Sequence, residues 1–187
     1  DLDVLICGQD ASNVRKTLIY ENKGNENFTE LAPNIPSVSR GLATWGDINN
    51  DGLLDIALSG LDNSNNYITE IYTNTGNKSF ISHNANLQKL AFTDQNFVDY
   101  DNDGDLDLFI NGSHSSGTNL IKLYKNNSAN FVEQTPFTAL WNVSSSWGDY
   151  DADGDADLIY IGLAGSTPTV YYYRNDGSDV FTLINLS

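Results

Sequence analysis

Short stretches in which apolar and polar residues alternate, or in which apolar residues follow one another, recur along the whole chain. Residues 105–110 end at an Asn-Gly pair, and residues 120–124 alternate before an Asn-Asn-Ser turn. A two-residue period bounded by such turn signals is typical of β-strands. No window shows the spacing of apolar positions that an amphipathic helix needs. The pattern therefore predicts an all-β chain.

The predicted strands repeat with a period of about 50 residues. Asp47, Asp99 and Asp149 each open an Asp-x-(Asp/Asn)-x-Asp-Gly-x-x-Asp run. Four further sets of positions keep the same spacing: Gly8, Gly60, Gly112 and Gly162; Tyr20, Tyr72, Tyr124 and Tyr173; Asn22, Asn74, Asn126 and Asn175; and Phe28, Phe80, Phe131 and Phe181. Agreement across so many positions indicates that the chain is built from copies of one structural unit.

Each complete unit is predicted to contain four strands. The first ends at an aromatic residue (Trp45, Phe97 or Trp147) just before the acidic run, and the second follows the run. The third ends at a Tyr-x-Asn sequence, and the fourth surrounds the repeated Phe. Repeated units of four strands are typical of propeller blades, whose faces become buried only when neighbours stack. We therefore predict a β-propeller of four-stranded antiparallel blades.

The phase of the repeat predicts one partial blade and three complete blades. Because Asp3 aligns with Asp55, the first blade lacks its first strand and has three strands. The expected blades are residues 1–40 (partial), 41–90, 91–139 and 140–187, within a single β-propeller repeat region that spans residues 1–187. We expect this region to be a segment of a larger propeller, and a compact four-bladed ring is the alternative that the length permits.

The acidic runs, residues 47–55, 99–107 and 149–157, have the spacing of calcium-binding loops. Oxygen ligands at positions 1, 3 and 5 point inward, Gly at position 6 permits the turn, and the carbonyl at position 7 adds an oxygen. No run has the Glu that an EF-hand needs at position 12, so Asp at position 9 must complete the set. The predicted metal ligands are Asp47, Asn49, Asp51, Leu53, Asp55, Asp99, Asp101, Asp103, Asp105, Asp107, Asp149, Asp151, Asp153, Asp155 and Asp157, with a partial fourth site at Asp1 and Asp3.

Runs of Asp, Asn and Gly can also form plain turns, because their short polar side chains cap turns. Four carboxylates within about 5 Å repel one another by on the order of 3 kcal/mol per pair at an effective dielectric constant near 20. A divalent cation removes this repulsion, which favours Ca²⁺ loops over plain turns. Mg²⁺ suits the runs less well, since it demands a smaller and stricter octahedron. We expect about three Ca²⁺ sites and no other cofactor.

The charge balance excludes one class of partner. The chain has 25 Asp plus Glu against 9 Lys plus Arg, a formal net charge of −16, and 13 of the acidic residues lie in the three runs. Such a charge repels a phosphate backbone, and the scattered basic residues form no stripe, so we expect no nucleic-acid partner. No apolar stretch is long enough to cross a bilayer, so we expect no direct membrane insertion.

Residues 147–158, Trp-Gly-Asp-Tyr-Asp-Ala-Asp-Gly-Asp-Ala-Asp-Leu, together with the Tyr-x-Asn and Phe that follow, resemble the FG-GAP and VCBS repeats of integrin α-subunit-like propellers. The resemblance extends over essentially the full chain, and it implies an extracellular or cell-surface location. It also implies that the metal loops lie on one face, between the first and second strands. Ligands would then bind on the opposite face. Fold likeness does not identify a ligand.

The loops expected on that opposite face are rich in Asn, Ser and Thr, and they include residues 9–14, 61–66, 113–118 and 163–168. They suit hydrogen bonding to a protein or a glycan, and Trp141 and His114 are candidate contact residues. We therefore expect a non-enzymatic calcium-binding module for adhesion or recognition. One alternative is a structural repeat of a surface filament or giant adhesin that self-assembles or continues into further repeats.

A calcium-dependent polysaccharide lyase or lectin is a further alternative, because some calcium-containing propellers that resemble this chain cleave polysaccharides. The residues argue against catalysis. Only two His residues are present, His83 and His114, and neither recurs with the repeat. The chain has no Ser-His-Asp order and no nucleophile elbow. We expect no catalytic residues.

Overall fold

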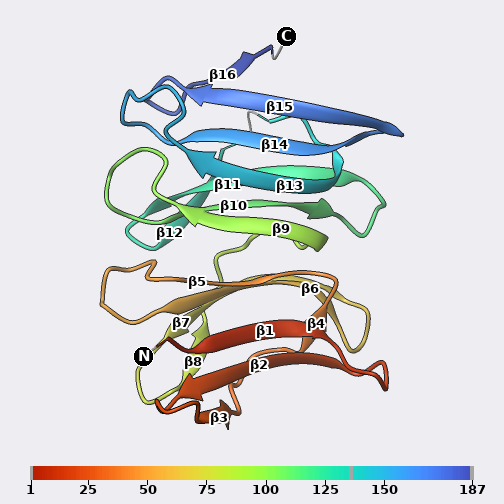
Figure 1. The fold of residues 1–187 in the computed structure, drawn as a ribbon, viewed down its shortest axis with the longest axis vertical. Coiled ribbons are helices and arrows are strands. Elements are labelled where there is room, and N and C mark those ends of the chain that lie inside the picture. The colour runs from red at the N-terminus through yellow and green to blue at the C-terminus, as the bar shows by residue number, and fades with distance from the viewer. Residues whose placement is uncertain (1, 135–136, 186–187) are drawn as a thin grey trace. The chain divides into compact units, whose positions relative to one another are not determined.

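The computed structural model describes residues 2–134 and 137–185, and these residues form sixteen β-strands and no helix (Figure 1). The chain divides into two compact units, Asp1–Phe92 and Thr93–Ser187. The strands form four antiparallel sheets, so the predicted all-β fold of blade-like sheets is confirmed. No helix in the described part of the chain is long and apolar enough to span a membrane.

The first unit contains two sheets. The first sheet has the order β1 (Val4–Gln9), β2 (Arg15–Asn22) and β3 (Phe28–Leu31). The second sheet contains β6 (Asp55–Asp62), β7 (Tyr67–Asn74) and β8 (Phe80–Ser82), and both β4 (Val38–Ser39) and β5 (Ala43–Gly46) pair with the outer side of β6. This sheet therefore begins at Val38, three residues before the expected start of the second blade.

The second unit contains two four-stranded sheets. The third sheet consists of β9 (Ala91–Val98), β10 (Asp107–Ser113), β11 (Asn119–Asn127) and β12 (Asn130–Gln134). The fourth sheet consists of β13 (Trp141–Gly148), β14 (Asp157–Ala164), β15 (Thr167–Asn175) and β16 (Phe181–Ile184). In both sheets the strands follow one another in chain order, as they do in a propeller blade.

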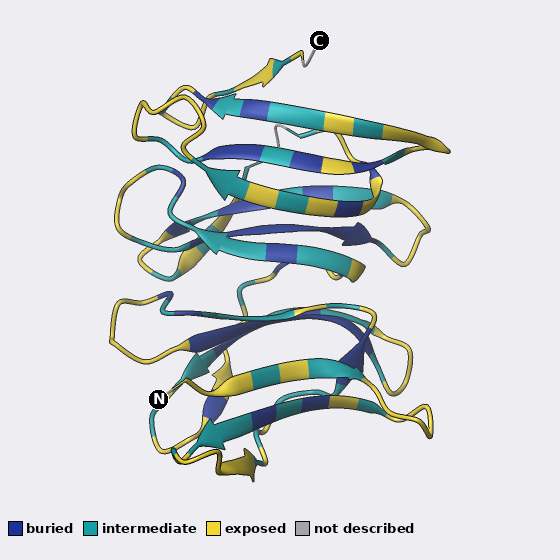
Figure 2. Cartoon of the chain, viewed as in Figure 1, coloured by how far each residue is buried: buried dark blue, intermediate teal, exposed yellow. Residues whose placement is uncertain are grey.

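Each unit has its own apolar core, and the long inner strands β6 and β10 are buried along almost their whole length (Figure 2). The repeated aromatic residues meet within these cores. Trp45 at the end of an outer strand lies against Phe80 of the fourth strand, with ring centroids 6.2 Å apart. Trp147 and Phe181 repeat this contact in the second unit at 6.2 Å. The two aromatic positions recur because their side chains pack against each other.

The outer strand of each complete blade bends at one residue in the left-handed region, and the three residues are one repeat apart. Their φ angles are 56° at Arg40, 57° at Phe92 and 47° at Asn142. In the second sheet this bend separates β4 from β5, and in the fourth sheet the register shifts between Trp141 and Ser144. The bend is therefore a β-bulge that the repeat preserves.

The bulge explains why glycine recurs on the neighbouring strand. A Cβ atom at Gly60 would lie 2.6 Å from the Ser39 carbonyl oxygen, and one at Gly162 would lie 2.7 Å from the Trp141 carbonyl oxygen. At Gly8, where β1 pairs only with β2, an added Cβ would meet no atom within 4 Å. The bulged outer strand therefore leaves no room for a side chain at this position.

We predict that Gly162→Ala lowers the free energy of unfolding by about 2 kcal/mol, because the new methyl group overlaps the outer strand. Gly8→Ala is the matched control, and it should cost less than about 0.5 kcal/mol, since the space beside Gly8 is open. Urea unfolding followed by tryptophan fluorescence measures both changes. Equal losses in the two variants would contradict this steric explanation.

Candidate metal centres

The last aspartate of each acidic loop anchors that loop in the fold. Asp55, Asp107 and Asp157 are fully buried. Each Oδ2 accepts a hydrogen bond from the backbone N–H of the second loop residue: Ile48 at 3.1 Å, Tyr100 at 3.1 Å and Tyr150 at 3.0 Å. Each Oδ1 accepts one from the third strand of its sheet: Asn74 N–H at 2.7 Å, Asn126 N–H at 2.7 Å and Asn175 N–H at 2.8 Å. Both oxygens of the carboxylate thus tie the loop to the sheet.

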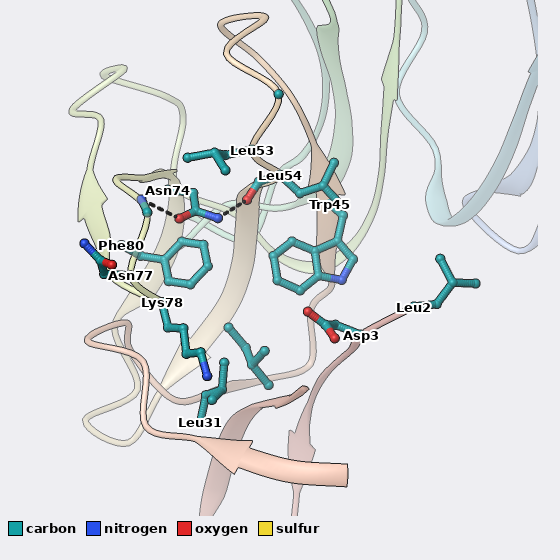
Figure 3. Close-up of a pocket in the computed structure, with 13 residues that line it drawn as sticks. Leu2, Asp3, Leu31, Trp45, Leu53, Leu54, Asn74, Asn77, Lys78 and Phe80 are labelled. Carbon is teal, nitrogen blue, oxygen red and sulfur yellow. Dashed lines mark hydrogen bonds between the residues drawn. The ribbon is translucent and has the colours of Figure 1, made fainter. Parts of the chain in front are cut away.

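The asparagine of the Tyr-x-Asn sequence completes this connection. In the second sheet, Asn74 Nδ2 donates to the Leu54 carbonyl at 3.1 Å, and Asn74 Oδ1 accepts from Gly76 N–H at 3.0 Å (Figure 3). Asn175 makes the corresponding bonds in the fourth sheet, and in the third sheet Asn126 Nδ2 donates to the Leu106 carbonyl while its Oδ1 accepts from Ala129 N–H, three residues on instead of two. The asparagine recurs because it holds the end of the acidic loop and the next turn together.

The first aspartate of each loop lies at the centre of the turn. Asp99 accepts hydrogen bonds from the backbone N–H groups of Asp103 and Gly104, both at 3.1 Å. The first and third loops repeat this arrangement around Asp47 and Asp149. The glycine at position 6 has a φ of +90° in the second loop, a conformation that glycine adopts without strain. The backbone therefore holds the loop closed around its acidic side chains.

Two loops bring three carboxylates together. In the second loop, candidate ligand oxygens of Asp99, Asp101 and Asp107 all lie within 4.8 Å of one another. In the third loop the same holds for Asp149, Asp151 and Asp153. The two sets differ at one position, since the second loop uses the buried closing aspartate and the third loop uses position 5. Each set contains three of the four side chains that the spacing predicts as ligands, since position 7 would bind through its backbone carbonyl.

The first loop differs from the other two at position 3. Asn49 Nδ2 donates to Asp51 Oδ2 at 3.1 Å, and Asn49 Oδ1 accepts from Asp51 N–H at 3.1 Å. An amide therefore partners the carboxylate of position 5, where the other loops place a further negative charge. The partial fourth site is described only at Asp3, whose Oδ1 accepts from Asn22 N–H at 2.9 Å. Asp1 lies outside the described residues.

The side chains at position 7 interact outside their own loops. Asp105 Oδ2 accepts from Ser128 N–H at 2.9 Å, and Asp155 Oδ1 accepts from Asn102 Nδ2 at 2.8 Å. Leu53 lines an adjacent cavity (Figure 3). This placement agrees with a ligand role through the backbone carbonyl at position 7, which stays a prediction.

The environment of Asp101 indicates whether the second loop can bind a cation. Its side chain is only 9% exposed, and its Oδ2 pairs with Lys125 Nζ. Its Oδ1 is buried and has no hydrogen-bond partner among the described residues. A buried carboxylate oxygen without a partner is costly, and a hard cation bound among Asp99, Asp101 and Asp107 would satisfy it. The donor set, which consists of oxygens alone, therefore fits Ca²⁺.

Burial also changes the ionisation of the closing aspartates. Removal from water raises the pKa of the Asp107 carboxyl to about 7, and it raises the pKa of Asp55 as well. Protons and a cation therefore compete for the second loop near neutral pH. The hydrogen bond to Asp101 raises the pKa of Lys125, so this side chain stays positively charged beside the loop.

A cavity of about 380 Å³ lies beside the first loop, within the first unit. Figure 3 shows Trp45 and Phe80 facing it, with Asp3 and Lys78 near its rim.

In the second unit, Tyr100 of the second loop lies against Phe181, the repeat equivalent of Phe80, with ring centroids 5.7 Å apart. In the second unit, packing of Tyr100 against Phe181 therefore helps to fix the position of the second acidic loop.

Sequence reasoning missed three residues around the second loop. Tyr100 Oη donates to Asp179 Oδ1 at 2.6 Å, and Lys125 lies between Asp101 and Asp179. Lys125 is the variable middle residue of a Tyr-x-Asn sequence, and Asp179 follows that motif one repeat later. The sequence shows that Lys125 and Asp179 are charged, but it does not show that they contact the second loop.

The fold and the loops define a repeat protein of blade-like antiparallel sheets that carry acidic loops. The sequence matches the FG-GAP-like repeat over residues 1–58 and 99–160, which is more than half of the chain. The chain therefore belongs to the FG-GAP-like repeat family, and the resemblance noted in its motifs is confirmed. Repeats of this family are generally non-enzymatic modules. A comparison with curated protein sequences found no match.

We predict that the metal-free protein loses stability as the pH rises from about 4 to about 7. In this window the folded protein holds a proton on Asp107, whose pKa is raised to about 7, whereas the unfolded chain has already lost it. The melting temperature in excess chelator should therefore be lower at about pH 8 than at about pH 5. Asp107→Asn cannot ionise and should show much less of this dependence. A wild-type melting temperature that rises over the same interval would contradict the prediction.

Proposed function

We propose that this chain is a calcium-binding extracellular β-propeller module for adhesion or recognition, without enzymatic activity. The observation that carries the proposal is the buried Oδ1 of Asp101, which has no hydrogen-bond partner among the described residues and belongs to a group of three carboxylates. Asp99, Asp101 and Asp107 would hold Ca²⁺ in the second loop. The equivalent set in the third loop is Asp149, Asp151 and Asp153.

Bound Ca²⁺ would act on stability in this module. It would offset the repulsion among the acidic side chains, and it would fasten the loop that joins the outer strand to the second strand. Loops stabilised by Ca²⁺ in this way suit an environment with abundant calcium, and family membership also supports an extracellular role. The calcium-bound loops would then stabilise the blades, and other surfaces would bind the ligand.

The surface that we assign to a protein or glycan ligand lies at the other end of each sheet. The hairpins between the second and third strands have exposed tips, at residues 10–14, 63–66, 115–118 and 164–168. Trp141, at the start of β13, pairs with Leu163 beside one of these hairpins and is 45% exposed. His114 lies in another hairpin, where its Nδ1 is 2.8 Å from Ser116 Oγ. An exposed tryptophan among polar groups suits recognition of either ligand class.

We predict that calorimetric titration of Ca²⁺ into chelator-stripped protein shows about three sites and that Ca²⁺ raises the melting temperature. Asp101→Asn should weaken or remove one site, because it removes a charged ligand. Asp62→Asn, at the opposite end of the second sheet, is the matched control and should leave all sites intact. Wild-type protein that binds no Ca²⁺ under these conditions would refute the proposal.

We predict that the calcium-loaded module binds members of a glycan array or a panel of extracellular proteins, and that Trp141→Ala weakens this binding at least about tenfold. Phe28→Ala is the matched control, since Phe28 is similarly exposed, at 47%, but starts β3 at the end of the first sheet where Asp3 lies. Equal loss in both variants would contradict the assigned surface. Absence of any binder would favour a purely structural repeat.

A further inference from the structure

The second acidic loop has a lysine in contact with one of its candidate ligands. Lys125 lies on β11, its side chain is 22% exposed, and its Nζ pairs with Asp101 Oδ2. The same Nζ lies 3.4 Å from Asp179 Oδ1. Asp101 belongs to the three-carboxylate group, and in the part of the chain that the structure describes its other oxygen is buried without a hydrogen-bond partner. A positive charge is therefore already present at the edge of the proposed calcium site.

The equivalent positions in the other repeats interact differently. In the second sheet the position is Thr73, whose Oγ1 lies 3.3 Å from His83 Nδ1. In the fourth sheet it is Arg174, whose guanidinium pairs with Asp176 through Nε at 2.7 Å and Nη2 at 2.6 Å. Asp176 lies outside the acidic loops. Among the three described loops, the second therefore differs in having a cation paired with a candidate ligand.

The second and third loops are otherwise closely matched. Both have aspartate at positions 1, 3, 5, 7 and 9, tyrosine at position 2 and glycine at position 6. Both have the same backbone hydrogen bonds to their first and last aspartates. The grouped carboxylates differ in burial, since Asp107 is buried whereas Asp149, Asp151 and Asp153 are exposed, and the loops also differ in the charged groups outside the run. Lys125 forms an ion pair with a candidate ligand of the second loop, whereas Arg174 has a longer-range charge interaction with Asp151 of the third loop and pairs with Asp176.

We propose that Lys125 is a resident counter-cation that sets the calcium affinity of the second loop and makes it weaker than that of the third loop. This inference rests on the proposed calcium binding. The ammonium group repels an incoming Ca²⁺ and occupies one oxygen of Asp101. Because both partners are largely shielded from water, solvent screens this repulsion less than it does at an open surface.

The arrangement has a consequence for the order of binding. As the calcium concentration rises, the third loop fills before the second. When calcium is removed, the second loop retains a partner for Asp101, whereas the three exposed carboxylates of the third loop form no such ion pair within residues 2–134 and 137–185. The second unit thus has one loop that responds to low calcium and one that responds only to higher calcium.

Calcium titration of Lys125→Thr tests the proposal, because threonine is the residue that the second sheet has at this position. One site should bind Ca²⁺ about tenfold more tightly than in the wild-type protein, as expected from removing one nearby charge. Lys125→Gln, which retains most of the side-chain length, should show the same gain. Arg174→Thr is the matched comparison and should change the affinity of the third loop less than Lys125→Thr changes that of the second, because Arg174 pairs with Asp176 and has only a longer-range charge interaction with Asp151.

A double-mutant cycle with Asp101→Asn shows whether the effect passes through Asp101. The gain from Lys125→Thr should be smaller in the Asp101→Asn background, because the part that comes from freeing the Asp101 oxygen is lost while the direct repulsion of Ca²⁺ by Lys125 remains. Unchanged or weaker binding by both lysine variants would overturn the proposal and would make Lys125 a residue that only positions Asp101. If the wild-type protein binds no Ca²⁺, both the proposed function and this inference fail. If it binds about three ions and Lys125→Thr changes none of the affinities, this inference alone fails.

Discussion

The structure of each complete blade depends on one buried carboxylate, the aspartate that closes the acidic loop. Asp55, Asp107 and Asp157 use one oxygen to hold the loop backbone and the other to hold the third strand. Burying a carboxylate is costly unless several donors surround it, and here backbone N–H groups supply them. The loop and the sheet are therefore structurally coupled, and an ion that stabilises the loop also stabilises the sheet.

The three loops share this anchor but differ in charge. Asn49 replaces a carboxylate in the first loop, Lys125 pairs with one in the second, and the third has neither feature. Within the second unit the loops are also joined to each other, since Asn102 Nδ2 donates to Asp155 Oδ1 at 2.8 Å and Asn175 Nδ2 donates to the Tyr100 carbonyl at 2.6 Å. A change at one loop can therefore reach the other through direct hydrogen bonds.

The first sheet provides an internal comparison that explains the repeated residues. It has the closing aspartate Asp3 and its asparagine partner Asn22, and their hydrogen bond persists. Its Gly8 has open space beside it, since β1 pairs only with β2, whereas Gly60 and Gly162 are crowded by a bulged outer strand. The aspartate and asparagine thus connect the inner strands to each other and do not require an outer strand. The glycine is required only where a bulged outer strand leaves no room for a side chain.

The sequence by itself determined the strand order and the positions of the acidic loops and of the repeated aromatic residues, because all of these recur with a fixed period and follow from local patterns. It did not determine which carboxylates of each loop come together, nor that Lys125 meets Asp101 from 24 residues away. It also did not show that Tyr100 and Asp179 meet, although 79 residues separate them. Only the tertiary structure decided these contacts, because they depend on how side chains from different strands and turns are brought together by packing.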